Sequence, residues 1–477
     1  MSSFFKLTLS ELSALIQSNE ISVEFVLSEY LDRIKIHNPD LNAIVSMVSE
    51  QHLFEQAREI DKIRDKTTLN KPLLGIPIAI KDLESTKNIK TTFGSKIFKN
   101  NIPNFDGVMA NKIRSAGAII IGKTNTPEFG IGSHTFNNVF GSTKNPYNKN
   151  LSAGGSSGGA ACAITANLLP VADGSDMMGS LRNPAAFNNI YGFRPTVGLV
   201  PNDDGLKDTS LIFSTTGPMG KTPEDLAFLL DVMVSPNQVR VKDLNLEAGK
   251  GKQDVKEKSV KNLSIGWLSD LIDQYDFEDG IIDLCQDCMK TLSYCGVKTS
   301  SVISKIPKFK LWSSWTSLRS VSLKKNLTTM FDVEEHYHNL KNEIRWEITN
   351  ADNVDKYEMQ RAIANKKEIM DLVNALFRKY DFLALPSAAV FPFDVNLHYP
   401  KSIAGKTMDT YHRWMEVVVL VSLLGLPCIS LPCGLSGQNL PTGLQIFGRP
   451  YSDIDILRLA KTYSKTTDKD KLRPILD

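Results

Sequence analysis

The stretch Gly154-Gly-Ser-Ser-Gly-Gly-Ala-Ala-Cys-Ala-Ile-Thr-Ala166 joins a loop rich in glycine and serine directly to a run of small apolar residues. Glycines permit backbone angles that other residues avoid, so such a loop can turn tightly and bring its N–H groups close to a reactant. A helix that begins there adds a partial positive charge at its first turn. Most Gly/Ser clusters are flexible linkers, but a linker does not lead straight into an apolar helix. We therefore expect a loop that surrounds a reacting group.

Ser157 also occupies the centre of a Gly-x-Ser-x-Gly frame that runs from Gly155 to Gly159, the pattern of the nucleophile elbow of α/β-hydrolases. That motif requires a buried strand immediately before it. The preceding residues 145–152, NPYNKNLS, have the composition of a loop. The elbow interpretation is therefore disfavoured, and it predicts that a downstream histidine such as His412 is essential while Lys81 is dispensable.

A second polar segment, Asp173-Gly-Ser-Asp-Met-Met-Gly-Ser-Leu-Arg-Asn-Pro184, places Ser180 24 residues after Ser156. The main-chain N–H groups of Met177, Met178, Gly179 and Ser180 can converge on one oxygen atom there. An oxyanion hole requires that arrangement, and a single donor in it contributes roughly 3 kcal/mol to transition-state stabilisation. An ordinary polar turn explains the same residues, so the segment is not decisive alone.

The third segment is Gly75-Ile-Pro-Ile-Ala-Ile-Lys-Asp82, which predicts a buried strand ending in a lysine. In an extended strand Pro77, Ala79 and Lys81 share one face, opposite the three isoleucines. Lys81 then points from the strand end toward a face of small residues. A lone lysine at a strand end is usually a solvated surface group. Its importance depends on the other two segments.

Together, the three segments in this order resemble the amidase-signature family of serine hydrolases. The resemblance covers most of residues 5–235 and 375–450 and is weakest between them. It implies an α/β fold in which a central, mixed, twisted β-sheet is covered by helices on both faces. Further matching motifs are Gly94-Ser95, Gly122-Lys-Thr-Asn125, Gly192-Phe-Arg-Pro-Thr196, Gly217-Pro-Met-Gly220, Leu385-Pro386, Gly425-Leu-Pro427, Leu431-Pro432 and Gly443-Leu-Gln445.

The resemblance also implies a role for each reactive residue. Ser180 matches the nucleophile that attacks the amide carbonyl and forms an acyl-enzyme. Ser156 matches the bridging serine that follows a cis peptide bond. Lys81 matches the general base, which takes the proton through Ser156 and must therefore be neutral, so we expect its pKa to be depressed by burial. The oxyanion donors are then the N–H groups of Met177, Met178, Gly179 and Ser180.

Four neighbouring residues are expected to support this site. Asp176 and Arg182 match positions that brace the nucleophile loop, and Ser157 and Ser175 are expected to hydrogen-bond beside the reactive groups. The family often has two glycines before the nucleophile, whereas this chain has Met178 and Gly179, so the methionine side chain should fill part of the pocket. The DMMGS variant is similar to the branch that contains 6-aminohexanoate cyclic-dimer hydrolases.

Along the chain, short apolar runs alternate with amphipathic segments, which favours a mixed sheet with helices on both faces. We expect residues 1–477 to form a single amidase domain. Its middle region, approximately 235–370, is variable and helical and includes a charged, Gly-containing linker at 235–262. Trp312 and Trp315 in that region line the substrate entrance or pack between helices. Strands are predicted at 75–80, 118–121, 265–268, 382–385, 429–431 and 444–447, and helices at 23–36, 108–116, 159–169 and 224–233.

Composition limits the classes of partner. The 477 residues are 42% hydrophobic and carry 55 Lys plus Arg against 53 Asp plus Glu, a formal charge of +2. This balance gives no electrostatic case for nucleic acid or an anionic membrane surface. No apolar stretch approaches the roughly 18 residues of a membrane-spanning helix, and the N-terminus lacks the features of a secretory signal. The six cysteines follow no disulfide framework, so we expect a cytoplasmic protein.

We therefore expect an amidase that hydrolyses the C–N bond of a small carboxamide or a short amide-linked oligomer through a Ser180 acyl-enzyme. No cofactor is expected, and no metal, because the seven histidines form no ligand pattern. The expected partner is a small-molecule amide substrate, and a homodimer is left open. One alternative is the glutamine-hydrolysing subunit of a tRNA-dependent amidotransferase. Another is a catalytically inactive scaffold or ligand-binding protein, although all three reactive positions are present.

Overall fold

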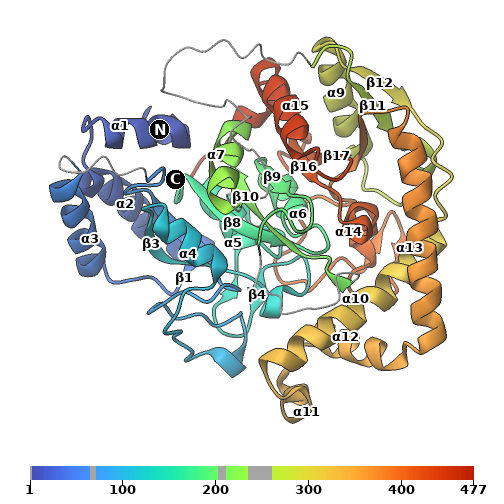
Figure 1. The fold of residues 1–477 in the computed structure, drawn as a ribbon, viewed down its shortest axis with the longest axis horizontal. Coiled ribbons are helices and arrows are strands. Elements are labelled where there is room, and N and C mark those ends of the chain that lie inside the picture. The colour runs from blue at the N-terminus through green and yellow to red at the C-terminus, as the bar shows by residue number, and fades with distance from the viewer. Residues whose placement is uncertain (1–2, 65–70, 202–210, 235–259, 477) are drawn as a thin grey trace.

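A mixed sheet of eight strands runs through the middle of the fold (Figure 1). The computed structural model describes residues 3–64, 71–201, 211–234 and 260–476. The neighbours of β11 in this sheet run parallel to it, and the other neighbouring pairs are antiparallel. In spatial order the strands are β12 (Lys298–Ser301), β11 (Ser264–Trp267), β13 (Phe382–Pro386), β17 (Pro441–Gly448), β16 (Cys428–Leu435), β9 (Tyr191–Arg194), β10 (Thr215–Gly220) and β8 (Val171–Asp176).

A second sheet of three strands lies beside the β8 edge of the first. Its order is β1 (Ile44–Val45), β3 (Ile119–Thr124) and β2 (Pro77–Lys81), with β2 parallel to β3. The main-chain N–H of Lys81 donates to Oδ1 of Asp173 in β8 at 3.0 Å, so the end of β2 meets the large sheet. Three short two-stranded ribbons are β4 (Phe136–Asn137) with β5 (Gly141–Ser142), β6 (Lys144–Asn145) with β7 (Asn148–Ser152), and β14 (Ser402–Ile403) with β15 (Lys406–Thr407).

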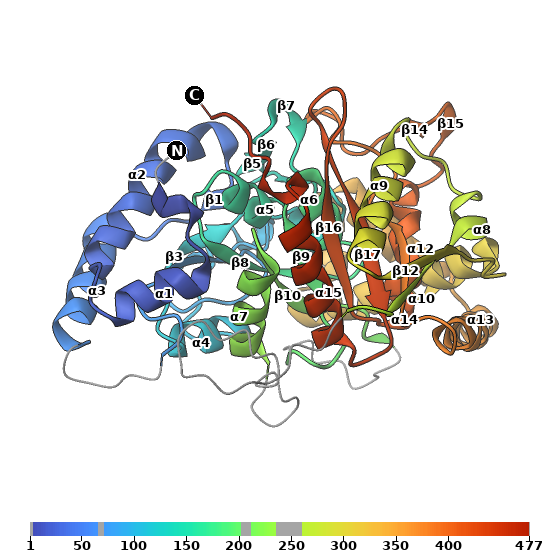
Figure 2. The same ribbon diagram turned by 90° about the horizontal axis from the view of Figure 1, so that it is seen from above.

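Helices cover both faces of the eight-stranded sheet. In Figures 1 and 2, α7, α15 and α9 lie along one face, while α6 and α14 lie on the other side with the long helices α10, α12 and α13 beyond them. This arrangement confirms the predicted fold class.

The α-helices are α1 (Leu9–Gln17), α2 (Val23–Leu41), α3 (Glu50–Ile63), α4 (Val108–Ser115), α5 (Gly158–Thr165), α6 (Arg182–Phe187), α7 (Pro223–Met233), α8 (Ser269–Ile272), α9 (Ile281–Tyr294), α10 (Lys308–Met330), α11 (Val333–His336), α12 (Asn342–Asn353), α13 (Lys356–Phe377), α14 (Val419–Leu424) and α15 (Asp453–Thr466). The 3₁₀ helices are Ser3–Lys6, Lys96–Phe98, Glu128–Gly130, Tyr337–Asn339, Arg413–Val418 and Lys469–Lys471.

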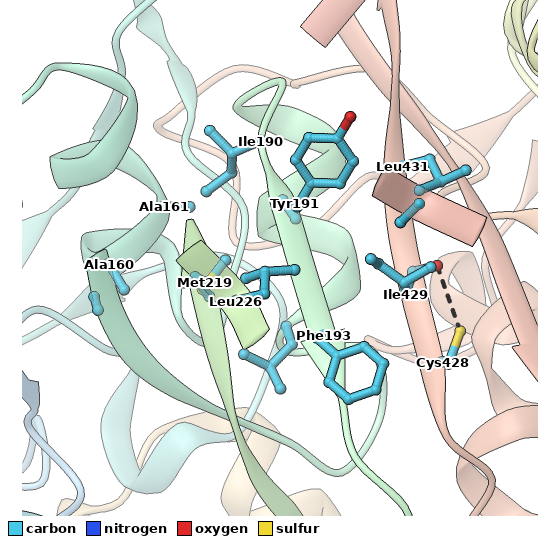
Figure 3. Close-up of a cluster of buried hydrophobic side chains, with 14 of the residues drawn as sticks. Ala160, Ala161, Ile190, Tyr191, Phe193, Met219, Leu226, Cys428, Ile429 and Leu431 are labelled. Atoms are coloured by element: carbon cyan, nitrogen blue, oxygen red, sulfur yellow. Dashed lines mark hydrogen bonds between the residues drawn. The ribbon is translucent and has the colours of Figure 1, made fainter. Parts of the chain in front are cut away.

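One continuous hydrophobic cluster extends from Phe5 near the N-terminus to Tyr463 in α15. Figure 3 shows its part at the centre of the large sheet, where Phe193 of β9 lies beside Ile429 of β16. These two residues are also register partners across the strand pair. Because side chains on the covered faces are excluded from water, their burial is the main favourable term that holds the strands and helices together.

The Gly/Ser loop leads directly into α5, whose residues are all buried. A side chain at Gly159 would place its Cβ 2.3 Å from the N of Asn125 and 2.6 Å from the carbonyl O of Ala43. Glycine is therefore required because the start of α5 passes against the main chain of the three-stranded sheet. The glycines predicted to favour a reactive loop also permit this close packing.

All six predicted strands are present with shifted boundaries. Four strands of the large sheet were not predicted: β12 at one edge, and β9, β10 and β8 at the other. The strand β1 of the small sheet and the strands of the three ribbons were not predicted either. The predicted linker lies almost wholly in residues 235–259, outside the described residues. The described part of the middle region, from residue 260 on, contains the strands β11 and β12 as well as helices α8 to α12 and most of α13. Among the residues that the structure describes, no helix is both long and apolar enough to cross a bilayer.

Candidate active site

A cavity of about 850 Å³ opens where the two sheets and α10 come together, and the three reactive residues predicted from the sequence all line it. Lys81 reaches it from the end of β2, Ser156 from the loop before α5, and Ser180 from the turn between β8 and α6. Segments that are far apart in the chain thus contribute to one site. Ser180 is 8% exposed and Ser156 is 2% exposed, so both hydroxyls lie inside the protein rather than on its surface.

The ammonium nitrogen of Lys81 lies among three serine hydroxyls. Its Nζ is 2.8 Å from Oγ of Ser156 and 2.9 Å from Oγ of both Ser157 and Ser175. A charged ammonium donates to all three. A neutral amine has only two N–H groups and one lone pair, so it donates to two hydroxyls and accepts a proton from the third. The geometry therefore suits either protonation state of Lys81.

Burial makes the neutral state of Lys81 accessible near neutral pH. The side chain is 2% exposed, and this loss of water lowers the pKa of Lys81 from 10.5 to about 7, although the carboxylates of Asp173 and Asp176 favour the charged form. An ordinary lysine is almost entirely protonated at pH 7. With a pKa of about 7, a large fraction of Lys81 has a free lone pair under the same conditions.

The loop that carries Ser156 is held on several sides. The peptide bond between Gly155 and Ser156 is cis, and the hydroxyl of Ser133 donates to the carbonyl O of Gly155 at 2.6 Å. One residue later, the N–H of Ser157 donates to the carbonyl O of Ser180 at 3.2 Å. This last contact joins the main chains of the two serine segments, so their relative position is fixed by the backbone.

Asp176, at the end of β8, is a fully buried carboxylate between two arginines. It accepts from Nε and Nη2 of Arg182 at 3.0 and 2.9 Å, and Nη1 of Arg194 lies 3.2 Å away. Burial by itself raises the pKa of a carboxyl, but the guanidinium groups of Arg182 and Arg194 hold the pKa of Asp176 well below its usual range. Asp176 is therefore ionised throughout the neutral pH range.

Arg182 extends this support to the C-terminal part of the chain. Its Nη1 donates to the carbonyl O of Val418 at 3.1 Å and to Oε1 of Gln445 at 2.8 Å, and its Nη2 donates to Oγ of Ser422 at 2.7 Å. The planar guanidinium offers five donors, and this buried setting supplies an acceptor for each of its three nitrogens. The turn that carries Ser180 is thereby connected to α14 and β17.

The same carboxylate shapes the turn before Ser180. The N–H of Gly179 donates to Oδ1 of Asp176 at 2.8 Å, so this group, predicted as an oxyanion donor, is engaged elsewhere. Gly179 has a φ of +81°, and a Cβ there would lie 2.5 Å from Oδ1 of Asn183, which requires glycine. Within the described residues, no protein group accepts from the N–H of Met177, Met178 or Ser180. Those three donors remain for a ligand oxygen.

Met178 lines the cavity, as predicted, and its sulfur accepts a hydrogen bond from Nε1 of Trp315 at 3.2 Å. Trp315 itself is fully buried and packs edge-to-face on Phe213. Neither Trp312 nor Trp315 lines the described cavity, so the two tryptophans pack between elements rather than form the substrate entrance. Trp315 influences the cavity through Met178.

All eight candidate side-chain positions are brought together by the fold: Lys81, Ser156, Ser157, Ser175, Asp176, Met178, Ser180 and Arg182. Sequence reasoning assigned no role to Arg194 or Gln445, and it did not connect Trp315 with Met178. The Gly-Phe-Arg and Gly-Leu-Gln motifs contain Arg194 and Gln445 and were the available signal. Trp315 belongs to the region of weakest resemblance, where no motif pointed to it.

The alternative chemistries find less support in the geometry. The strand before the Gly-x-Ser-x-Gly frame, β7, is mostly exposed, whereas a nucleophile elbow requires a buried strand. No histidine is among the described residues that line the cavity. His412 packs against the rings of Trp312 and Trp346 instead. In the described part of the chain, no group of three or more His, Cys, Asp or Glu side chains is arranged to hold a metal ion.

Comparison with known proteins identifies the class. Residues 25–457 match the Amidase family model. The chain is 31% identical to a glutamyl-tRNA(Gln) amidotransferase subunit of Clostridium acetobutylicum, over 96% of this chain and 98% of that protein. It is 30% identical to the acylamidase of Rhodococcus erythropolis, over 96% of this chain and 94% of that one.

Solved structures show the same fold. A bacterial aryl acylamidase of the amidase-signature enzymes superposes with a TM-score of 0.85 at 24% identity, covering 98% of this chain and 99% of that one. A 6-aminohexanoate cyclic dimer hydrolase complexed with substrate gives a TM-score of 0.81 at 21% identity, covering 98% and 99%. At these identities the likeness concerns the fold alone. The chain belongs to the amidase-signature family, whose enzymes are hydrolases that act on carbon–nitrogen bonds.

Proposed function

We propose that this protein is an amidase that hydrolyses the C–N bond of a small carboxamide or a short amide-linked oligomer, with Ser180, Ser156 and Lys81 as its reactive residues. The observation that carries the proposal is the 2.8 Å contact between Nζ of the buried Lys81 and Oγ of Ser156 in the cavity that Ser180 also lines. A nucleophilic hydroxyl needs a base within reach, and no histidine lines the described cavity.

The reaction begins with neutral Lys81. Its lone pair accepts the proton of Ser156 while Oγ of Ser156 takes the proton of Ser180, and Oγ of Ser180 forms a bond to the amide carbonyl carbon. The carbonyl oxygen becomes an oxyanion, and we propose that the N–H groups of Met177, Met178 and Ser180, which have no acceptor among the described residues, stabilise it. The arginine-paired Asp176 supports their turn without reacting.

Collapse of the tetrahedral intermediate breaks the C–N bond and leaves an acyl-enzyme on Ser180. The ammonium of Lys81 returns its proton through Ser156 to the departing nitrogen, which leaves as an amine or ammonia. Water then attacks the acyl carbonyl carbon, with Lys81 again as base, and the carboxylic acid is released. The three residues thus return to their starting state, and the cycle needs no cofactor.

A glutamine-hydrolysing amidotransferase subunit is the second candidate, because a relative that is 31% identical is named as part of such an enzyme. The chemistry at Ser180 is the same in both proposals. They differ in whether ammonia is passed to another protein chain and in whether glutamine is the substrate. For either, we propose that residues 1–477 act as one amidase domain, since one hydrophobic cluster spans the fold. A cytoplasmic location and a homodimer remain proposals from the sequence.

The test is labelling by a fluorophosphonate, followed by mass spectrometry of the modified peptide and hydrolysis assays on simple amides, esters, glutamine and 6-aminohexanoate oligomers. We expect the label on the peptide that contains Ser180 and turnover of at least one amide, both lost in Ser180→Ala. A label elsewhere with activity retained in Ser180→Ala would falsify the mechanism. Copurification with a stable partner, or glutamine as the best substrate, would favour the amidotransferase alternative.

A further inference from the structure

Many apolar side chains line the cavity in addition to the reactive residues. We call six of them, from three parts of the fold, the apolar lobe: Phe93, Phe105, Phe129, Leu323, Leu327 and Met330. Phe105 is 58% exposed and Met330 is 38% exposed, so apolar surface reaches the solvent. At about 850 Å³, the cavity is much larger than a simple primary amide requires.

The acidic side chains that line the described cavity already have partners in the protein. Oε1 of Glu84 accepts from the N–H groups at the start of α4, 2.8 Å from Met109. Asp106 binds Nε of Arg114 at 2.7 Å. Asp173 accepts the main-chain N–H of Lys81 at 3.0 Å. These carboxylates therefore serve to hold the cavity wall together.

The basic side chains are engaged in the same way. Nζ of Lys112 donates to the carbonyl O of Val234 at 2.9 Å, and Arg319 is ion-paired with the buried Glu347. Lys81 is occupied by the three serine hydroxyls. Three basic and three acidic side chains thus line the described cavity, so the formal charges of its lining cancel. A charge on a bound molecule meets no net opposite charge there.

We infer that the substrate carries an uncharged, apolar arm beside the reacting amide, and that this arm lies against α10 and the three phenylalanines. The inference rests on the proposed amidase function. Desolvating an unpaired charge is costly, whereas each methylene buried in such a lobe improves binding. Free glutamine, with an ammonium and a carboxylate on one carbon, is a poor match to this lining.

The experiment compares kcat/KM for acetamide, butanamide, pentanamide and hexanamide with glutamine and 6-aminohexanamide. Burial predicts a rise of roughly threefold for each added methylene. We expect 6-aminohexanamide, which differs from hexanamide only by a terminal ammonium, to fall at least about tenfold below it, and glutamine to fall below pentanamide. A flat series, or glutamine equal to or better than pentanamide, overturns the inference.

Introducing a carboxylate into the apolar lobe tests whether the apolar arm of the substrate lies there. Met330 is the last residue of α10 and is partly exposed, so Met330→Glu should fold normally. We expect it to raise the ratio of kcat/KM for 6-aminohexanamide to that for hexanamide about tenfold, because the carboxylate pairs with the ammonium. The matched control is Phe309→Glu, on the same helix, 82% exposed and away from the cavity lining, where the ratio should not change. An unchanged ratio in Met330→Glu overturns the placement.

Failure of the inference is distinguishable from failure of the proposed function. If Ser180 is labelled by the fluorophosphonate and amides are hydrolysed, but without the chain-length dependence, only the inference is lost. If Ser180 is neither labelled nor needed for turnover, the proposed function fails, whatever the order of the substrates.

Discussion

The ends of β2 and β3 each carry a buried lysine, and the two differ in what surrounds the nitrogen. Burial lowers the pKa of Lys81 to about 7 and that of Lys123 to about 8. Lys81 lies among three hydroxyls in the cavity wall. Lys123 donates to the carbonyl O of Glu84 and to the hydroxyl of Thr86, and it is not among the residues that line the cavity.

The comparison teaches that a depressed pKa alone does not make a lysine a base. A neutral amine keeps two N–H groups, so both lysines can lose a proton and still donate to two partners. The difference is that one hydroxyl beside Lys81, that of Ser156, belongs to a residue that lines the cavity together with Ser180. Lys81 lines the cavity and Lys123 does not, so of these two lysines only Lys81 is in a position to act on a bound substrate.

Replacing each lysine by methionine should give the largest difference. We expect Lys81→Met to lower kcat by about 10³-fold or more, because the base is lost. Lys123→Met should change kcat less than about tenfold, and should reduce the free energy of unfolding by about 1–3 kcal/mol as buried acceptors lose their donor. Steady-state kinetics and urea denaturation measure the two effects. Equal losses of kcat in both variants would contradict the distinction.

Removing the three hydroxyls around Lys81 one at a time sharpens the comparison. Ser156→Ala should lower kcat by about 10²-fold or more because the proton relay to Ser180 is broken, with water a partial substitute. Ser157→Ala and Ser175→Ala leave that relay intact and serve as matched controls, each expected to lose about tenfold or less. If the three variants behave alike, Ser156 has no special role.

The pH dependence of turnover reports the protonation of Lys81. Since only the neutral form acts as base, kcat/KM should rise about tenfold per pH unit below a midpoint near 7 and level off above it. Lys123→Met should keep this midpoint within about half a unit, because Lys123 is not the titrating group. A profile that peaks below neutrality would count against Lys81 as the base.

The free energy of unfolding should depend on pH because the pKa of Lys81 differs between the folded and the unfolded chain. The folded-state pKa of Lys81 lies below its ordinary value of 10.5, so the unfolded chain binds more protons between those two pH values. The free energy of unfolding of the wild type, relative to Lys81→Met, should therefore rise with pH by about 1.4 kcal/mol per unit between pH 7 and 10. Denaturation of both proteins at matched pH values gives this difference, and a fall with pH contradicts it.

The smallest effect is expected at Trp315, which acts on the site only through Met178. Trp315→Phe removes the N–H donor to the sulfur but keeps an aromatic ring on Phe213. We expect kcat to fall only about twofold to fivefold and the free energy of unfolding to change by about 1 kcal/mol or less. Met178→Leu removes the acceptor, and the double variant should show no additional loss if the contact is the cause.

Much of the site was predictable because its residues are concentrated in short motifs. Lys81, Ser156 and Ser180 each stand in a segment whose glycines and small residues mark close packing, and their order along the chain is specific to one family. The strand that leads to Ser180, β8, was harder to recognise. β8 contains Asp173, Gly174 and Asp176, and glycine and aspartate are depleted in strands. Asp173 lines the cavity, whereas Asp176 binds Arg182 and Arg194.

The supporting contacts could not be predicted because they connect distant parts of the chain. Arg194 and Gln445 converge on Asp176 and Arg182 only after β9 and β17 have joined the same sheet. Likewise, the N–H of Gly179 has the same chemistry as those of its neighbours, but in the fold it already donates to Oδ1 of Asp176. The sequence indicates which groups can react or donate, whereas tertiary structure decides which of these groups remain free to bind a ligand.

The partners of Arg182 have a consequence for synthesis of the protein on the ribosome. The three residues that we propose to react have all been synthesised by residue 180. Arg182 is bound locally by Asp176, but its other acceptors come from residues 418, 422 and 445. A nascent chain that ends before Gln445 lacks at least one of these acceptors, so hydrolytic activity should appear only when translation is nearly complete.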